Sequence, residues 1–429
     1  MIRSTPSLLS GSFSLLVKNP RSLDFDNKRT HFSLAMKEDE RRIYREEQVA
    51  AGRNGNRPPA LGTDPPSPTL QLNIRRDHIL TDSFHAFSRR NAKELRRGKL
   101  SIRFTGEEGV DAGGVGREWL SVLATQIFDP NNALFRPSPV DRVTYQPNPD
   151  SGINPDHLQF FTFVGRVIGK ALRDGRLIDA HFTRSFYKHM LGKSISYHDV
   201  EAVDPDYYKS LVWLLENDIT GVVDDMNFSA EVDHFGETNV VDLIPGGRDI
   251  LVTEENKEQY VRLIVEHKLT RAIRDQIDAF LLGFHEMVPR RLVEIFDERE
   301  LELLISGLPE VDIDDWRAHT EYQAGYTASS PQVQWFWRAV RSFGPEERAK
   351  LLQFSTGTAK VPLQGFAGLE GSNGQQKFQI QRNPGRPDRL PTAHTCFNQL
   401  DIPEYESYEQ LRTFLVYAIQ ECSTGFGFG

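Results

Sequence analysis

The sequence contains only two cysteines, Cys396 and Cys422, and their surroundings predict different roles. Cys422 continues the apolar stripe of a predicted C-terminal helix, which is typical of a buried and inert thiol. Cys396 lies among polar residues between Pro391 and Pro403, which favours an exposed loop or strand edge. Sulfur is nucleophilic enough for acyl exchange even when only a small fraction of the thiol is ionised. We therefore predict that Cys396 is a nucleophile.

His394 stands two residues before Cys396 and would share a face with it if the segment is extended. It could then assist or orient the thiol, and a solvated or backbone-bound histidine remains an equally open interpretation. These two residues supply at most two soft metal ligands, and no CxxC or HExxH motif occurs, so we expect no metal site. The glycine-rich stretch 106–116 lacks the GKS or GKT ending of a phosphate loop, so we expect no cofactor. A papain-like protease is disfavoured because no histidine follows Cys396.

Length and charge narrow the function classes. The 429 residues exceed one typical domain and predict two or three globular units. The net charge of −9, without a basic block interleaved with aromatic residues, disfavours nucleic acid as a ligand. No apolar run approaches the ~20 residues of a membrane-spanning helix, so we expect no membrane association. The lack of a disulfide framework predicts a reducing compartment, the cytoplasm or the nucleus.

The first seventy residues differ in amino-acid composition from the rest of the chain. Residues 1–51 predict a helical lead-in, and its charged stretch 36–47 predicts a solvated helix. Residues 1–23 contain no acidic residue and also resemble an organelle transit peptide, which is the less favoured alternative. The proline- and glycine-rich residues 52–69 predict a flexible linker and a domain boundary.

Periodic apolar residues from 70 to about 315 predict a mainly helical unit. Helices are expected at 115–128, 154–172, 181–191, 205–216, 254–268, 270–288 and 297–305, and short strands at 100–104, 239–243 and 250–253. After Gly307, short apolar runs at 351–354 and 377–381 alternate with turn residues and predict a smaller α/β unit. Its last helix is expected to begin at Ser407, whose spacing to Gln410 fits a capping box.

Five motifs together resemble one known family. They are DAGGVGREW (111–119), FFTFVGRVIGKAL (160–172), LLISGLP (303–309), LLQFSTGTAKVP (351–362) and LPTAHTCFNQLDIPEY (390–405). In this order and spacing they are similar to a HECT domain, the catalytic module of one class of ubiquitin ligases, over residues 72–429. Residues 13–29 resemble the sequence before the HECT domain in Mule-type large HECT ligases and their fungal relatives. The chain is therefore expected to be a C-terminal portion or a short relative of such a ligase.

The resemblance implies an α+β, bilobal fold. A large, mainly helical N-lobe at residues 70–318 would dock a ubiquitin-conjugating enzyme, and a smaller α/β C-lobe at 319–429 would carry the cysteine. A short hinge near 318–322 would join the two lobes.

The resemblance also implies site residues. It makes Cys396 the nucleophile that forms a glycyl thioester, supported by His394 and Thr395, and it matches Phe426 to an aromatic residue near the family's C-terminal end. It places the conjugating-enzyme groove on Tyr207, Leu211, Leu214, Met226 and Phe228. The first three also fit one buried face of a helix, so ordinary core burial remains open for them.

The implied function is that of a ubiquitin-protein ligase. It would accept ubiquitin from a charged conjugating enzyme as a thioester on Cys396 and transfer it to a lysine of a protein substrate. The alternative is a catalytically silent HECT-like module that only binds a conjugating enzyme or ubiquitin. The intact HTCFN sequence and Phe426 favour the active ligase.

Overall fold

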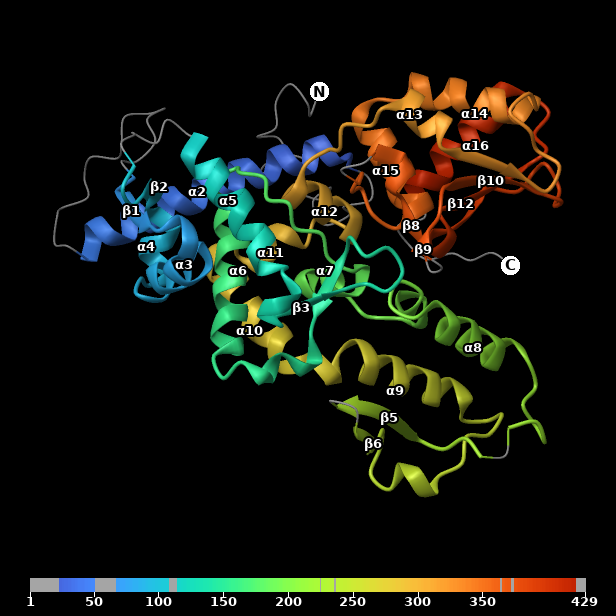
Figure 1. The fold of residues 1–429 in the computed structure, drawn as a ribbon, viewed down its shortest axis with the longest axis horizontal. Coiled ribbons are helices and arrows are strands. Elements are labelled where there is room, and N and C mark those ends of the chain that lie inside the picture. The colour runs from blue at the N-terminus through green and yellow to red at the C-terminus, as the bar shows by residue number, and fades with distance from the viewer. Residues whose placement is uncertain are drawn as a thin grey trace.

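The computed structural model describes residues 23–50, 67–107, 114–223, 225–234, 237–362, 365–371 and 374–421 (Figure 1). The predictions about a transit peptide, Cys422 and Phe426 fall outside these ranges. Helices dominate the first three quarters of the chain, and the one four-stranded sheet among the described residues lies near the C-terminal end. The α+β, bilobal architecture is confirmed.

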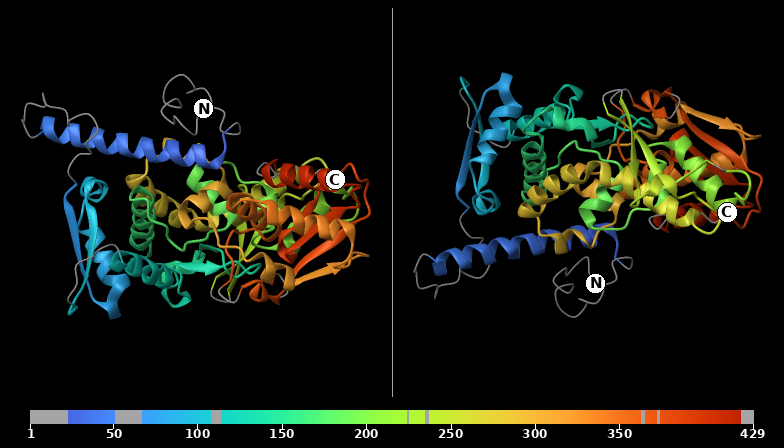
Figure 2. Two further views of the ribbon diagram at one scale, coloured as in Figure 1. Left: turned by 90° about the horizontal axis from the view of Figure 1, so that it is seen from above. Right: turned by 90° about the horizontal axis from the view of Figure 1, so that it is seen from below.

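The first described helix, α2 (Phe25–Ala50), lies within the helical lead-in expected at residues 1–51, and one of its faces is buried. Figure 2 shows α2 as a long helix along one side of the molecule. Phe25, Phe32 and Met36 belong to the same hydrophobic core as the lobe that follows. The prediction of a solvated helix at 36–47 therefore fits only one face of α2, because Met36, Asp39 and Ile43 on the other face are buried.

The larger lobe, which we call the N-lobe, contains the described residues between 23 and 306. Its helices after α2 are α3 (Ile79–Ser88), α4 (Ala92–Arg97), α5 (Gly114–Ile127), α6 (His157–Arg173), α7 (Arg184–Leu191), α8 (Pro205–Glu216), α9 (Lys257–Leu269), α10 (Arg274–Met287), α11 (Arg290–Val293) and α12 (Glu298–Ser306). Its strands form three separate pairs, which are the parallel pair β1 (Thr69–Ile74) and β2 (Lys99–Phe104) and the antiparallel pairs β3 (Phe135–Pro137) with β4 (Tyr145–Pro147) and β5 (Ser229–His234) with β6 (Glu237–Asp242).

Helices α6 and α10 form the centre of the N-lobe. Glycines let their backbones meet, since a Cβ atom at Gly165 would stand 2.1 Å from the Phe280 carbonyl oxygen and one at Gly283 would stand 1.9 Å from that of Thr162. Any larger residue at these two positions would force the helices apart. The helix expected from 154 begins later, at His157, because a short 3₁₀ turn precedes it.

A smaller unit of the N-lobe has a hydrophobic core of its own. This core joins α8, α9 and the β5–β6 hairpin and includes Leu211, Leu214, Phe228 and Tyr260. Figure 1 shows this unit projecting below the rest of the lobe. The strand expected at 250–253 is wrong, because this segment makes only one isolated bridge.

The smaller lobe, which we call the C-lobe, contains the described residues between 312 and 421. Its helices are α13 (Ile313–Ala318), α14 (Pro331–Ser342), α15 (Pro345–Thr356) and α16 (Tyr408–Glu421). Its sheet has the order β11 (Thr392–His394), β12 (Gln399–Pro403), β10 (Phe378–Asn383) and β7 (Thr320–Gln323), beside a small hairpin of β8 (Glu370–Gly371) and β9 (Gly374–Gln375). The run 351–354 lies within α15, and the cap of α16 is confirmed, since the Gln410 N–H donates to the Ser407 hydroxyl at 3.1 Å.

The connection between the lobes lies earlier in the chain than the expected hinge at 318–322. Trp316 is fully buried in the C-lobe core, and Thr320 begins strand β7, so both residues belong to the C-lobe. The segment 307–311 instead connects α12 to α13, and it starts at Gly307, whose φ of +86° favours glycine. The expected hinge position and the expected boundary at 318/319 are therefore wrong.

Candidate active site

Cys396 occupies the middle of a short 3₁₀ turn, Thr395–Phe397, at the edge of the C-lobe sheet. The turn joins β11 to β12, which run antiparallel. The chain is extended only as far as His394, so the condition under which His394 and Cys396 would share a face is not met. A turn placed at a sheet edge presents its middle residue outside the regular hydrogen bonding of the strands.

Asn398 fixes the end of this turn. Its φ of +49° lies in the left-handed region, which asparagine tolerates better than most residues. Its side-chain amide donates to the Gln376 carbonyl at 2.9 Å, and its own carbonyl accepts from the Gln379 N–H at 2.9 Å. Asn398 is only 1% exposed, so it is a buried anchor and not part of the exposed loop expected from the sequence.

Thr395 packs against the end of helix α15. A Cβ atom at Gly357, which terminates α15 with a φ of +86°, would lie 3.6 Å from the Thr395 Cβ. The helix end and the turn are thus in van der Waals reach of each other. The order of the turn depends on this glycine, because a larger residue would be strained in its backbone.

His394 pairs with Asp401 across the β11–β12 hairpin. Its Nε2 lies 3.3 Å from an Asp401 carboxylate oxygen. This hydrogen bond raises the pKa of His394, and the charges of Asp401 and Glu201 act in the same direction against partial burial. A protonated imidazole has no free lone pair, so His394 in this state does not act as a base.

The turn faces helix α8 of the N-lobe across a pocket of about 590 Å³. Its lining from the C-lobe is His394, Phe397 and Gln399, and its lining from α8 includes Tyr208, Lys209 and Trp213. The Lys209 ammonium lies 5.3 Å from the centre of the Phe397 ring, a cation–π distance. The residue next to Cys396 therefore touches the helix on which the conjugating-enzyme groove was expected.

A second pocket, of about 440 Å³, lies beside this one on α8. It contains four of the five expected groove residues, Tyr207, Leu211, Leu214 and Met226. Leu211 and Leu214 form its buried floor, so they are core residues that also line this pocket. Burial raises the pKa of the Tyr207 hydroxyl, which therefore remains protonated.

Trp213 and Lys209 line both pockets and form the ridge between them. Trp213 is 45% exposed although it is a large aromatic residue. Sequence reasoning missed Trp213 because it stands off the stripe that Leu211 and Leu214 define. A tryptophan on the polar side of an amphipathic helix was the available signal.

Phe228 does not line the groove, contrary to expectation. It is 1% exposed, and its ring packs edge-on against Tyr260 with centroids 5.7 Å apart. A Cβ atom at Gly247 would stand 2.1 Å from the Phe228 carbonyl oxygen, so the surrounding turn also encloses its backbone. Phe228 supports the pocket from beneath, because Tyr260 is one of the lining residues.

Glu302 of α12 holds the two lobes together. Its carboxylate accepts from the Gln353 amide at 2.8 Å, the Thr358 hydroxyl at 2.7 Å and the Ala359 N–H at 3.0 Å, all from the C-lobe. It also lies 2.9 Å from Nδ1 of His181 in the N-lobe. Burial alone would favour the neutral acid, but these hydrogen bonds hold the pKa of Glu302 below its usual value.

Among the described residues, no group of three or more His, Cys, Asp and Glu side chains could hold a metal ion. Within the same part of the chain, no helix is both long and apolar enough to cross a bilayer.

Comparison with known proteins connects this geometry to a family. The family described as HECT-domain (ubiquitin-transferase) matches residues 121–429, which include the turn, both pockets and the lobe contact. The chain is 57% identical over 428 residues to the E3 ubiquitin-protein ligase TOM1-like of Neurospora crassa, covering 100% of this chain and 10% of that protein.

Relatives from two other organisms show the same similarity. The chain is 52% identical over 425 residues to the E3 ubiquitin-protein ligase HUWE1 of Mus musculus, covering 99% of this chain and 9% of that protein. It is 50% identical over 434 residues to the E3 ubiquitin-protein ligase UPL1 of Arabidopsis thaliana, covering 100% of this chain and 11% of that protein. The chain thus spans about a tenth of the length of the curated relatives it matches. It belongs to the HECT-domain (ubiquitin-transferase) family.

Proposed function

We propose that this chain is the catalytic module of a ubiquitin-protein ligase and that Cys396 carries ubiquitin as a thioester. The observation that supports this best is the placement of the 395–397 turn beside α8. The pocket between the turn and α8, which we call the turn pocket, shares Lys209 and Trp213 with the second pocket on α8, which we call the groove. A conjugating enzyme in the groove would approach the turn without leaving α8.

The proposed chemistry is two acyl transfers. In the first, the Cys396 thiolate attacks the glycyl carbonyl of ubiquitin on the conjugating enzyme, a new C–S bond forms, and the conjugating enzyme leaves as a thiolate. In the second, the neutral amine of a substrate lysine attacks the same carbonyl, the C–S bond breaks, and the amine proton passes to solvent or a base. Neither step needs an oxidant or a cofactor.

His394 fits the first step as a source of charge. Because Asp401 raises its pKa, His394 is more often protonated than an ordinary histidine at neutral pH. Positive charge beside a thiol favours the thiolate, which is the reactive species. Thr395 holds the turn against α15, and we propose that Phe426 assists the second step.

The groove residues Tyr207, Leu211, Leu214 and Met226 fit a role as the docking site of the conjugating enzyme. An apolar floor with aromatic and methionine side chains at its rim is typical of protein-binding surfaces. We add Trp213 as an exposed anchor and place Phe228 in support. We propose action in the cytoplasm or nucleus, on protein substrates with accessible lysines, since the two cysteines provide no disulfide framework.

The competing function is a silent module that binds a conjugating enzyme without forming a thioester. Both functions predict binding at the groove, but only the ligase predicts a covalent adduct. The chain is incubated with a ubiquitin-charged conjugating enzyme and run on a non-reducing gel. An adduct one ubiquitin heavier that disappears with thiol reductant supports the ligase, whereas binding by calorimetry without any adduct supports the silent module.

A further inference from the structure

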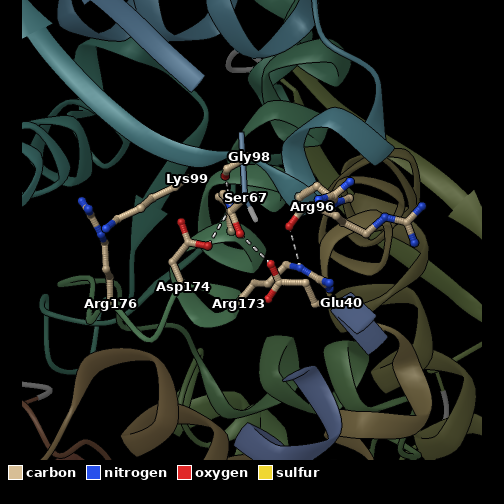
Figure 3. Close-up of a pocket in the computed structure, with 10 residues that line it drawn as sticks. Glu40, Ser67, Arg96, Gly98, Lys99, Arg173, Asp174 and Arg176 are labelled. Atoms are coloured by element: carbon tan, nitrogen blue, oxygen red, sulfur yellow. Dashed lines mark hydrogen bonds and ion pairs between the residues drawn. The ribbon is translucent and has the colours of Figure 1, made fainter. Parts of the chain in front are cut away.

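A basic pocket of about 280 Å³ lies on the N-lobe at the junction of α2, the end of α4, the start of β2 and the end of α6 (Figure 3). It shares no residue with the turn pocket or the groove. Six of its lining residues are cations, namely Arg96, Arg97, Lys99, Lys170, Arg173 and Arg176. The proposed function gives none of them a role.

The acids around the pocket do not balance these charges. Its lining contains two carboxylates, Glu40 and Asp174. Two more lie just outside, where Asp39 pairs with Arg173 at 3.0 Å and Glu47 pairs with Arg97. Asp39 and Glu47 are also shared with Arg42 and Lys93, so cations outnumber carboxylates at the pocket.

Carbonyl groups at the end of α4 accept hydrogen bonds from only two of the six cations. The Lys170 ammonium donates to the Gly98 carbonyl at 2.7 Å and pairs with Asp174 at 2.6 Å. The Arg173 Nε donates to the Arg96 carbonyl at 2.9 Å. Such contacts are ordinary for cations beside the carbonyl ends of helices. They leave the side chains of Arg96, Lys99 and Arg176 without a carboxylate within ion-pair distance in the described part of the chain.

Several guanidinium nitrogens in the pocket are buried without a hydrogen-bond partner among the described residues. They are Nε of Arg96, Nη2 of Arg173 and Nη1 of Arg176. Burial lowers the pKa of Arg96, and the neighbouring charge of Arg173 lowers it further. Figure 3 shows Lys99 and Arg176 approaching each other on one side of the pocket, with Arg96 and Arg173 on the other. Three residues that line this pocket thus have buried donors without partners in the described part of the chain, and leaving such donors unbonded is costly.

We propose that this pocket binds a small phosphate-bearing dianion. A phosphate group carries close to two negative charges at neutral pH, which suits a pocket whose cations outnumber its carboxylates. Its oxygens accept the forked N–H groups of arginine, and this geometry suits arginine better than lysine. The volume is at the small end for a ligand site, so it suits a phosphate group and not a larger organic body.

Binding there would also fasten α2 to the N-lobe. Glu40 belongs to α2, and Arg173 pairs with Asp39 of the same helix. An anion that neutralises the pocket would relieve the repulsion among the cations that α2 covers. A ligand of the folded state alone raises its apparent stability according to its concentration relative to Kd.

The test is isothermal titration of the chain with inorganic phosphate, with sodium chloride and sodium acetate at matched ionic strength as reference salts. The wild-type chain should show saturable phosphate binding and a melting temperature that rises with phosphate but not with the reference salts. Arg176→Gln and Lys99→Gln should each weaken phosphate binding by about tenfold or more, as expected for loss of one charge-assisted contact. Arg262→Gln, which removes an exposed arginine of α9, should leave it unchanged.

To distinguish a phosphate group attached to an organic molecule from free inorganic phosphate, a small phosphomonoester is titrated in parallel. Similar affinity for both ligands assigns the site to the phosphate group itself, and binding of only one identifies the source. The proposal is overturned if no saturable binding occurs at millimolar phosphate, if the reference salts raise the melting temperature equally, or if Arg176→Gln and Lys99→Gln bind like the wild type. No ubiquitin is present, so the outcome is independent of the proposed ligase activity.

Discussion

At the scale of single residues, the partners of the reactive segment matter more than its composition. Sequence reasoning singled out Cys396 and left two interpretations of His394 open. The structure provides the missing partner, Asp401, seven residues further along and across a hairpin. Since the register of β11 against β12 was not readable from the sequence, neither was this pair.

Asp401→Asn should slow formation of the proposed ubiquitin adduct near neutral pH. The change lets the pKa of His394 fall from its raised value, so less positive charge stands near the thiol. Loss of one such charge is worth about 1 kcal/mol, or about fivefold in rate. The measurement is the single-turnover rate of adduct formation from pH 6 to 9, with an NMR titration of His394.

The sign of the pH effect is fixed by the raised pKa of His394. The stabilising contribution of the His394–Asp401 pair is fully present below the unfolded pKa of histidine and is lost as pH rises through the folded one. The wild type and Asp401→Asn should therefore react alike at low pH, diverge between the pKa of His394 in the variant and its raised value in the wild type, and converge again above the raised value. Equal rates across the whole range would rule out an electrostatic role for this pair.

Asn398 offers a second prediction at this scale. Asn398→Ala should destabilise the C-lobe by about 1–3 kcal/mol, because it removes a buried hydrogen bond and places alanine in a left-handed conformation. Asn398→Gly keeps the conformation accessible and loses only the hydrogen bond, so it should cost less. Urea denaturation of both variants separates the contribution of the hydrogen bond from that of the backbone conformation. Equal losses of unfolding free energy would mean that the backbone conformation contributes nothing.

At the scale of elements, helices were predicted well and their contacts were not. Helix α8 begins and ends where the sequence indicated, because Asp204 caps it and Pro205 fits its first turn. The sheet was out of reach, since β7 pairs with β10 across more than fifty residues. The hinge was misplaced because the six-residue α13 gives no periodic signal, although it buries Trp316 in the C-lobe.

The groove on α8 makes a prediction that separates Trp213 from Phe228. Trp213→Ala should weaken binding of the conjugating enzyme by about thirtyfold, the effect of losing an anchor worth ~2 kcal/mol, while leaving the melting temperature nearly unchanged. Phe228→Ala should instead destabilise the α8–α9 unit by about 3–5 kcal/mol, since it empties a buried site.

Calorimetric titration and thermal melting of both variants check this pair. Asp206→Asn, at an exposed position of the same helix that lines neither pocket, is a control for changes on α8. A stable Phe228→Ala that has lost binding, together with a Trp213→Ala that binds normally, would restore Phe228 to the groove and remove Trp213 from it.

At the scale of the whole molecule, one buried carboxylate sets the relation of the lobes. Glu302 bonds to three groups of the C-lobe and to His181 of the N-lobe. Although burial lowers the pKa of His181, hydrogen bonds to Asp179 and Glu302 raise it overall. This contact holds the C-lobe where its turn faces α8, so the lobe arrangement and the site geometry are linked.

The lobes should therefore separate more readily at low pH. As pH falls through the lowered pKa of Glu302, the carboxylate that accepts three hydrogen bonds from the C-lobe is neutralised. Asp179 and Lys360, which pair at 3.1 Å at the edge of the contact, modify this limit.

Resonance energy transfer between dyes on the two lobes should fall in the wild type as pH drops through the lowered pKa of Glu302. Glu302→Gln should flatten the profile and reduce the transfer efficiency throughout, because an amide cannot accept the same bonds. A wild-type profile that stays flat from neutral pH down to about pH 2, or an unchanged profile in Glu302→Gln, would show that other contacts position the lobes.

The central claim is that the Cys396 sulfur carries ubiquitin, and replacing that one atom tests it most directly. In Cys396→Ser the acceptor becomes oxygen, so the account predicts an adduct that resists thiol reductant but is cleaved by hydroxide, because an oxyester replaces the thioester. Cys396→Ala should form no adduct, and Cys422→Ser should keep the reductant-sensitive one. A reductant-sensitive adduct in Cys396→Ser or in Cys396→Ala would contradict the account, because ubiquitin would then be carried by another thiol.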